Sequence, residues 1–330
     1  MFRKTAPRSL YREVALHALR LAWREKRLWP FAVLTALIQT GGIYDAIFIR
    51  LRPFFEGGRV AAHTGSQFTT ALWNLFSHAT WIYRLGFLES LVFSVVLALV
   101  ILGLAILAQG ILVLGINGHS HLKKPTIKSC FQSAGLAFVP LVLLNIFIFA
   151  CLWLLRFLAL VLPAPHALWA VLFSFLVFLV LVIAIAFFTS LHLLSLYALL
   201  ADQLSFRESL IHALRLLRHA WVIVIETAFV LLVIGLFICL ASISIALLVN
   251  LPLLLLMRAA ILLQMPLLFQ LTNAVSGTLV LLILVMGGAF AITFQYATWH
   301  GLYQRINDGT ALPKLHRISH WIARRFSRSA

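Results

Sequence analysis

Six polar side chains interrupt long apolar runs and are the first candidates for chemistry in this chain. They are Glu89, Gln109, Arg156, His192, Glu226 and Gln295. A charged group inside a membrane-spanning segment is costly, so it usually faces a partner or a water-filled cavity. Two roles are consistent with these six residues. In the first, they form a polar path for a proton, an ion or a lipid headgroup. In the second, they supply interhelical hydrogen bonds that stabilise the bundle by about 0.6 kcal/mol each.

The depth of these groups predicts which of them meet. Arg156 lies about six residues from the outer end of its apolar run, roughly 9 Å deep at the rise of a helix. Glu89 lies near the outer end of another run, so we expect these two side chains to pair. Glu226 enters from the opposite face. The polar groups at a depth comparable with Glu226 are Gln109, His192 and Gln295.

Motifs for catalysis or metal binding are weak. His119 and His121 are a possible metal pair, but no Cys, Asp or Glu lies nearby to complete a site, and a polar loop is the simpler interpretation. The sequence contains no G-x-S-x-G, H-E-x-x-H or G-x-x-x-x-G-K pattern. Glu226 with His192 is the single acid–histidine combination for an enzyme acting inside the membrane. We therefore expect no enzymatic activity, no metal and no cofactor.

A short basic stretch occurs twice. Residues 11–21 read YREVALHALRL and residues 206–216 read FRESLIHALRL. Helical spacing places apolar residues on one face and charged residues on the other, which predicts a basic amphipathic helix lying on the membrane surface. The alternative is an ordinary helix packed on the body of the protein. The candidate contacts to anionic lipid headgroups are Arg12, Arg20, Arg207, Arg215 and Arg218.

A weaker third copy follows the loop at residues 117–125. Thr126 is expected to cap a short helix that ends at Leu136, with Lys128 in place of Arg207 and Ala134 in place of Ala213. Ser205 and Glu208 have the spacing of a capping box for the second full copy. The sequence therefore predicts three surface helices, each followed by an apolar run.

The composition indicates that lipid is the solvent of this chain. Of its 330 residues, 63% are hydrophobic and 11% are charged, whereas soluble domains have roughly 45–50% and 25%. A net charge of +17 is also typical of nucleic-acid-binding proteins, and Trp321 and Phe326 of the basic tail have rings that stack on bases. Juxtamembrane clustering explains the charge more simply, so the expected partners are the bilayer and its anionic lipids, with no nucleic acid.

The apolar runs predict an all-α polytopic membrane protein of about six spans. The chain is interpreted as a single integral membrane domain, 1–330, with a basic surface helix at 1–27, a transmembrane bundle at 28–302 and a basic amphipathic tail at 303–330. Gln39 to Gly42 interrupt the first run, which either spans or is re-entrant. Residues 253–270 are expected to form an interfacial or re-entrant hairpin. The predicted spans are 28–49, 86–116, 137–162, 167–200, 221–249 and 272–302.

The distribution of basic residues predicts the orientation. Lys and Arg number eight before Trp29, three at 117–135, three at 201–220 and six after Gln304. With an even number of spans, all four blocks lie on one side, which the positive-inside rule makes the cytoplasm. We expect both termini and the amphipathic helices to face the cytoplasm, in the cell membrane. The three cysteines do not predict a disulfide framework, and no cleaved signal peptide is expected.

Two blocks of sequence resemble known proteins. Residues 23–31, WREKRLWPF, with GGIY at 41–44, are similar to the opening of uncharacterised bacterial multi-pass membrane proteins. Residues 197–202, YALLAD, followed by the second basic stretch, resemble that group and the membrane domain attached to some glycerophosphodiester phosphodiesterases. The resemblance implies a helical membrane bundle with surface helices. It implies no catalytic residues, because the soluble catalytic domain of those enzymes has no counterpart here.

The sequence thus favours a non-enzymatic membrane scaffold or anionic-lipid-interacting protein. A transporter or permease-like protein with a polar site near Glu226 is the alternative, because internal repeats are common in transporters. Both strong copies of the basic stretch are expected on the same side, whereas an inverted pair would favour the transporter more.

Overall fold

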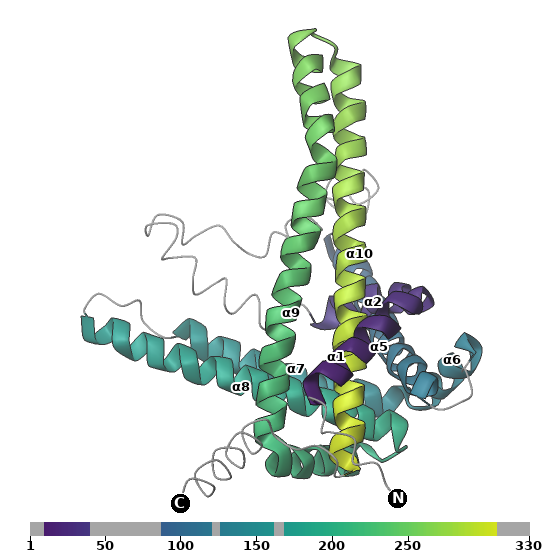
Figure 1. Ribbon diagram of the computed structural model, residues 1–330, viewed down its shortest axis with the longest axis vertical. Coiled ribbons are helices and arrows are strands. Elements are labelled where there is room, and N and C mark those ends of the chain that lie inside the picture. The colour runs from purple at the N-terminus through teal and green to yellow at the C-terminus, as the bar shows by residue number, and fades with distance from the viewer. Residues whose placement is uncertain (1–9, 40–86, 121–125, 162–167, 309–330) are drawn as a thin grey trace, which may run out of the picture.

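The computed structural model of the protein describes residues 10–39, 87–120, 126–161 and 168–308 (Figure 1). All regular structure in these residues is helical, which confirms the predicted all-α class. The elements are α1 (Leu10–Arg24), a 3₁₀ turn η1 (Lys26–Leu28), α2 (Trp29–Gln39), α5 (Phe87–Ser120), α6 (Ile127–Leu136), α7 (Phe138–Val161), α8 (Leu168–Ala201), α9 (Phe206–Leu262) and α10 (Pro266–Asn307).

Five of the described helices are long and apolar enough to cross a membrane, namely α5, α7, α8, α9 and α10. They correspond to five of the predicted spans, and the protein is a multi-pass membrane protein. The first predicted span, 28–49, includes α2, but its remainder lies outside the described residues. The parts of the basic tail beyond 308 and of the first segment before 10 also lie outside them.

One predicted boundary is wrong. The fifth predicted span does not end at 249, and residues 253–270 are not a separate element, because α9 continues through Pro252 to Leu262 and α10 begins at Pro266. The interfacial or re-entrant position of this segment stays a prediction. A short turn, with Gln264 at a φ of 53°, leads to Pro266, which lacks an N–H and is well suited to the first position of α10. Thus α9 and α10 form one long hairpin, whose tip is the segment 253–270 (Figure 1).

The two helices of this hairpin approach closely. A Cβ added at Gly287 would lie 2.2 Å from Ser242 Oγ, so only glycine fits there without movement of Ser242. Nearer the tip, Ser276 Oγ donates to Asn250 Oδ1 across the hairpin at 2.5 Å. After a kink at Ala220, α9 runs about 63 Å at 1.5 Å per residue, about twice the thickness of the hydrocarbon core.

A second hairpin, formed by α7 and α8, extends across the direction of α9 and α10 (Figure 1). The inner end of α8 meets the C-terminal part of α10 and the second half of α5. All residues of 191–200 are buried there, together with most of 292–306. The outer parts of both hairpins, by contrast, expose large apolar side chains along their length. The core therefore lies at one end of each hairpin.

Helix α1 packs on α10 with one face. Val14, Ala18 and Ala22 are buried, and a Cβ added at Gly301 of α10 would lie 3.0 Å from Val14 Cγ1. Arg305 Nη2 donates to Glu13 Oε2 at 3.0 Å across the same contact. Part of the apolar face is therefore used inside the protein, while the apolar side chain of Leu19 is 40% exposed.

The other two surface helices have the predicted caps. Ser205 and Glu208 form a reciprocal capping box at the start of α9, and the Thr126 side chain accepts a hydrogen bond from Ser129 N at the start of α6. Helix α6 packs against α5 through Cys130 and Ala134. The thiol of Cys130 is buried, and this burial raises its pKa.

Candidate functional site

Four buried polar side chains meet where α5, α7, α8 and α10 come together. Gln109 Nε2 lies 2.8 Å from the Tyr296 hydroxyl and 3.0 Å from His192 Nε2, and Asn145 Nδ2 donates to Gln109 Oε1 at 3.0 Å. We call Gln109, Asn145, His192 and Tyr296 the polar cluster. Each residue comes from a different helix, so the cluster joins four helices through one amide side chain.

The chemistry of the amide assigns the histidine tautomer. An amide nitrogen only donates, so His192 Nε2 must accept from Gln109, and the neutral ring carries its proton on Nδ1. Asn145 Nδ2 uses its second hydrogen on Leu141 O at 2.9 Å. In the described part of the chain, His192 Nδ1 and Ser195 Oγ are buried without a hydrogen-bond partner. Ser190, on the same helix, instead donates to Ala186 O.

A strip of aromatic and polar groups extends from the cluster toward the start of α9. Tyr197 donates to the backbone oxygen of Tyr296 at 2.6 Å, and the ring of His300 lies 5.3 Å from that of Tyr197. The hydroxyl of Tyr303 then donates to Asp202 Oδ2 in the turn between α8 and α9. The strip therefore links the buried cluster to an exposed acid at the end of α8.

The structure brings together two of the six intramembrane polar residues predicted from sequence, Gln109 and His192. Gln295 is half-buried beside Tyr296, and Glu226 is half-buried on α9; both lie outside the polar cluster. Glu89 is exposed in the first turn of α5. The side chain of Arg156 lies outside the described part, so its pairing with Glu89 stays a prediction.

Sequence reasoning missed the role of the tyrosines. Tyr197 and Tyr296 are among the largest fully buried side chains. In the sequence, each tyrosine was counted with the apolar residues of its span, so the hydrogen-bonding capacity of its hydroxyl was overlooked. Asn145 carried a clearer signal, because a lone amide within an apolar run needs a partner.

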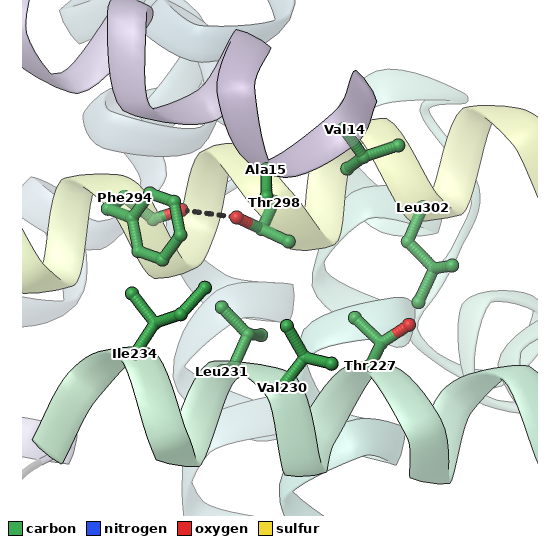
Figure 2. Close-up of a pocket in the computed structure, with 9 residues that line it drawn as sticks. All are labelled: Val14, Ala15, Thr227, Val230, Leu231, Ile234, Phe294, Thr298 and Leu302. Carbon is green, nitrogen blue, oxygen red and sulfur yellow. Dashed lines mark hydrogen bonds between the residues drawn. The ribbon is translucent and has the colours of Figure 1, made fainter. Parts of the chain in front are cut away.

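A small groove lies where α1, α9 and α10 come together, and Figure 2 shows the side chains from the three helices that line it. Its lining is almost wholly apolar, from Val14 and Ala15 on α1 to Ile234 on α9. The hydroxyls of Thr227 and Thr298, which also line it, are used by backbone oxygens one turn earlier. The groove thus offers apolar contact rather than polar recognition.

The predicted headgroup contacts lie on exposed surfaces. Arg20, Arg207, Arg215 and Arg218 are all exposed, and the side chain of Arg12 lies outside the described part. Large apolar side chains are exposed beside these arginines: Leu16, Leu19 and Trp23 on α1, and Ile211, Leu214 and Trp221 on α9. An exposed mixture of arginine and large apolar side chains is typical of a helix that lies in the headgroup region.

The described residues contain no group of three or more His, Cys, Asp and Glu side chains arranged to hold a metal ion. Comparison with protein-family models, curated proteins and solved structures found no match. The polar cluster and the basic helices are therefore the features of the molecule that bear on its function.

Proposed function

We propose that this protein is a non-enzymatic membrane scaffold that binds anionic lipids at the surface of α1 and of the first turns of α9. The observation that carries the proposal is shared by the two matching stretches. Each buries one face in the protein, and each exposes arginines beside large apolar side chains. The buried face fixes the helix, and the exposed face is left for the membrane.

The physical basis of this binding has two parts. The free energy falls when exposed leucine and tryptophan side chains leave water and enter the boundary between headgroups and acyl chains. Each nearby Lys or Arg adds roughly 1 kcal/mol on an anionic surface. Zwitterionic lipid supplies the first part only, so the scaffold should prefer anionic lipid. The proposed location is the cell membrane, with these helices and both termini on the cytoplasmic side.

Lipid retention tests the proposal. Native mass spectrometry of the full chain should show anionic lipid retained over zwitterionic lipid, and less of it after Arg207, Arg215 and Arg218 are changed to Gln. The matched control changes the same three residues to Lys, which keeps the charge and should retain the lipid. Equal retention of both lipid classes by the unmodified protein would sink the proposal.

Topology is tested separately. In a background without the native cysteines, Gln203→Cys, in the exposed turn before α9, should react with an impermeant thiol reagent only from the cytoplasmic side. Labelling from the opposite side would overturn the proposed orientation and, with it, the assignment of the basic helices to the cytoplasmic leaflet.

A permease-like function is the second candidate, and one observation favours it. His192 Nδ1 in the polar cluster and Ser195 Oγ, one turn further along α8, are buried without hydrogen-bond partners, and such atoms mark places where a solute or water binds. The expected result is a polar solute that travels with the purified protein and is lost from His192→Phe. A retained lipid with no solute would favour the scaffold.

A further inference from the structure

The junction between α1 and α2 carries a dense group of exposed cations. Arg24, Lys26 and Arg27 are all exposed and follow Trp23 in the chain, and the Trp23 side chain is 63% exposed. We call these four residues the junction site. Glu25 lies within the same turn and is half-buried. The site therefore keeps an excess of two positive charges within a segment of five residues.

The backbone of this junction is held firmly. Helix α1 ends at Arg24, Glu25 adopts a non-helical φ of −97°, and η1 follows. Leu28 is buried against α5, where a Cβ at Gly115 would lie 2.7 Å from Leu28 Cδ2. The indole of Trp29 donates to Ala22 O at 2.9 Å, which ties the start of α2 to the end of α1. The cations thus project from a fixed turn rather than from a free chain.

The aromatic contacts locate the junction site along α10. The rings of Trp23 and Trp29 both make T-shaped contacts with the ring of Phe290, at centroid distances of 6.1 and 6.3 Å. Phe290 lies between the buried part of α10, 292–306, and an exposed apolar part that includes Leu281, Leu282 and Met286. Tryptophan is enriched at the membrane–water interface, and Trp23 is exposed here.

The spacing of the cations separates this site from the start of α9. Arg207 and Arg218 are about 16 Å apart along the helix at 1.5 Å per residue, which exceeds the size of one phosphate. Arg24, Lys26 and Arg27 lie within one turn, and the Lys26 ammonium is already over the Trp23 ring at 5.6 Å. Arg215 and Arg218 are also about one turn apart, so the start of α9 brings two cations near one phosphate, whereas the junction brings three within four residues.

We propose that the junction site binds the phosphate headgroup of one anionic phospholipid from the bilayer. Arg24, Lys26 and Arg27 contact the phosphate, and Trp23 lies against the upper part of the acyl chains. This inference rests on the proposed lipid-binding function and adds a single preferred site to it. Binding at the start of α9 is then weaker and less specific.

Lipid titration of the full chain in detergent, followed by native mass spectrometry, tests the site. The triple variant R24Q/K26Q/R27Q is compared with R207Q/R215Q/R218Q, which removes the same number of charges. Each basic side chain near an anionic lipid strengthens binding roughly fivefold. We expect the junction variant to raise the Kd of the tightest anionic lipid at least about tenfold. The control should leave that Kd unchanged and remove only weaker binding events.

Three outcomes would overturn the site, and they are distinguishable. An unmodified protein with no preference for anionic lipid would remove both the proposed function and this inference. If the preference is present but the junction variant keeps the tightest event, the inference is wrong and the proposed function stands. Equal weakening in both triple variants would show that net charge, and not the junction, sets the affinity.

Discussion

The residues of α1 (10–24) and of the first turns of α9 have similar sequences, and they lie in similar surroundings. Val14, Ala18 and Ala22 are buried in α1, and Ser209, Ala213 and Leu217 are buried at the equivalent positions in α9. Both helices lie against the C-terminal part of α10, α1 through Val14 on Gly301 and α9 through His212 near the ring of Tyr303. The same pattern of buried residues therefore packs against α10 at two places in the chain.

The two stretches continue in different ways. Both leave helical geometry at equivalent residues, Glu25 with a φ of −97° and Ala220 with a φ of −118°. After Glu25 the chain makes a 3₁₀ turn and starts a new helix, with Pro30 in its first turn. After Ala220 it only kinks and continues as α9, with Ile225 at the position equivalent to Pro30.

Proline contributes to this difference. Pro30 has no N–H to donate to the preceding turn, which disfavours a continuous helix there, whereas the first turn of a new helix tolerates it. Pro252 inside α9 shows that a proline alone does not end a helix. Ile225 has its N–H, and α9 continues. The shared stretch therefore specifies a helix with one buried face, and the residues after it influence whether a sharp junction with exposed cations forms.

The largest expected effect comes from placing the proline in the other copy. Ile225→Pro should lower the stability by about 3 kcal/mol or more, because it removes a helical hydrogen bond and introduces a clash in the preceding turn. The measurement is thermal unfolding of the purified protein. Pro30→Ala is the reciprocal change and should cost far less. Similar small losses in both would show that proline does not set the difference.

A test of the shared buried face comes next. Ala18→Leu and Ala213→Leu should each cost about 1–3 kcal/mol, because both alanines are fully buried and the larger side chain forces its neighbours to move. Ala241→Leu, at an exposed position of α9, is the control and should be nearly neutral. A loss at only one of the two buried alanines would break the equivalence of the faces.

Removing the capping box at the start of α9 should have a smaller effect on stability. Ser205→Ala should destabilise by about 1 kcal/mol, because the N–H of Glu208 loses its acceptor at the helix start. Glu208→Gln should be tolerated, since glutamine also closes a capping box. Protection of amide hydrogens in the first turn of α9 measures both changes. Unchanged protection in Ser205→Ala would rule out a role for the cap.

The smallest effect concerns the acid that the two stretches share. Glu13 pairs with Arg305, whereas Glu208 caps its own helix. Glu13→Gln should cost about 0.2–1 kcal/mol, and the loss should shrink at high salt because the pair is partly exposed. A double-mutant cycle with Arg305→Gln gives the coupling energy, and a value indistinguishable from zero would contradict a stabilising pair.

Much of the fold could be predicted from the sequence, because its signals are local. The apolar runs predicted α5, α7 and α8 closely, and the capping residues Thr126 and Ser205 predicted where α6 and α9 begin. Pro252 was misleading, because a proline usually ends a helix. Within α9 it is tolerated, and the nearby Asn250 side chain accepts a hydrogen bond from Ser276 across the hairpin.

The polar cluster could be predicted only in part. The sequence identified Gln109 and His192 as polar groups at comparable depth, and these two do meet. Which further groups join them depends on how each helix is rotated about its axis, and no local pattern sets that rotation. The packing of the helices therefore brings the hydroxyl of Tyr296 and the amide of Asn145 into the polar cluster, and the sequence alone does not predict this.

The burial of Cys130 makes the contact between α6 and α5 measurable. Only the thiolate reacts with alkylating reagents, and burial both raises the pKa of this thiol and shields it from them. The rate at which Cys130 is alkylated should therefore follow how often α6 lifts away from α5. Cys239, exposed on α9, reports instead on whether lipid covers that helix. The chain thus carries intrinsic kinetic reporters of its own opening and of its coverage by the bilayer.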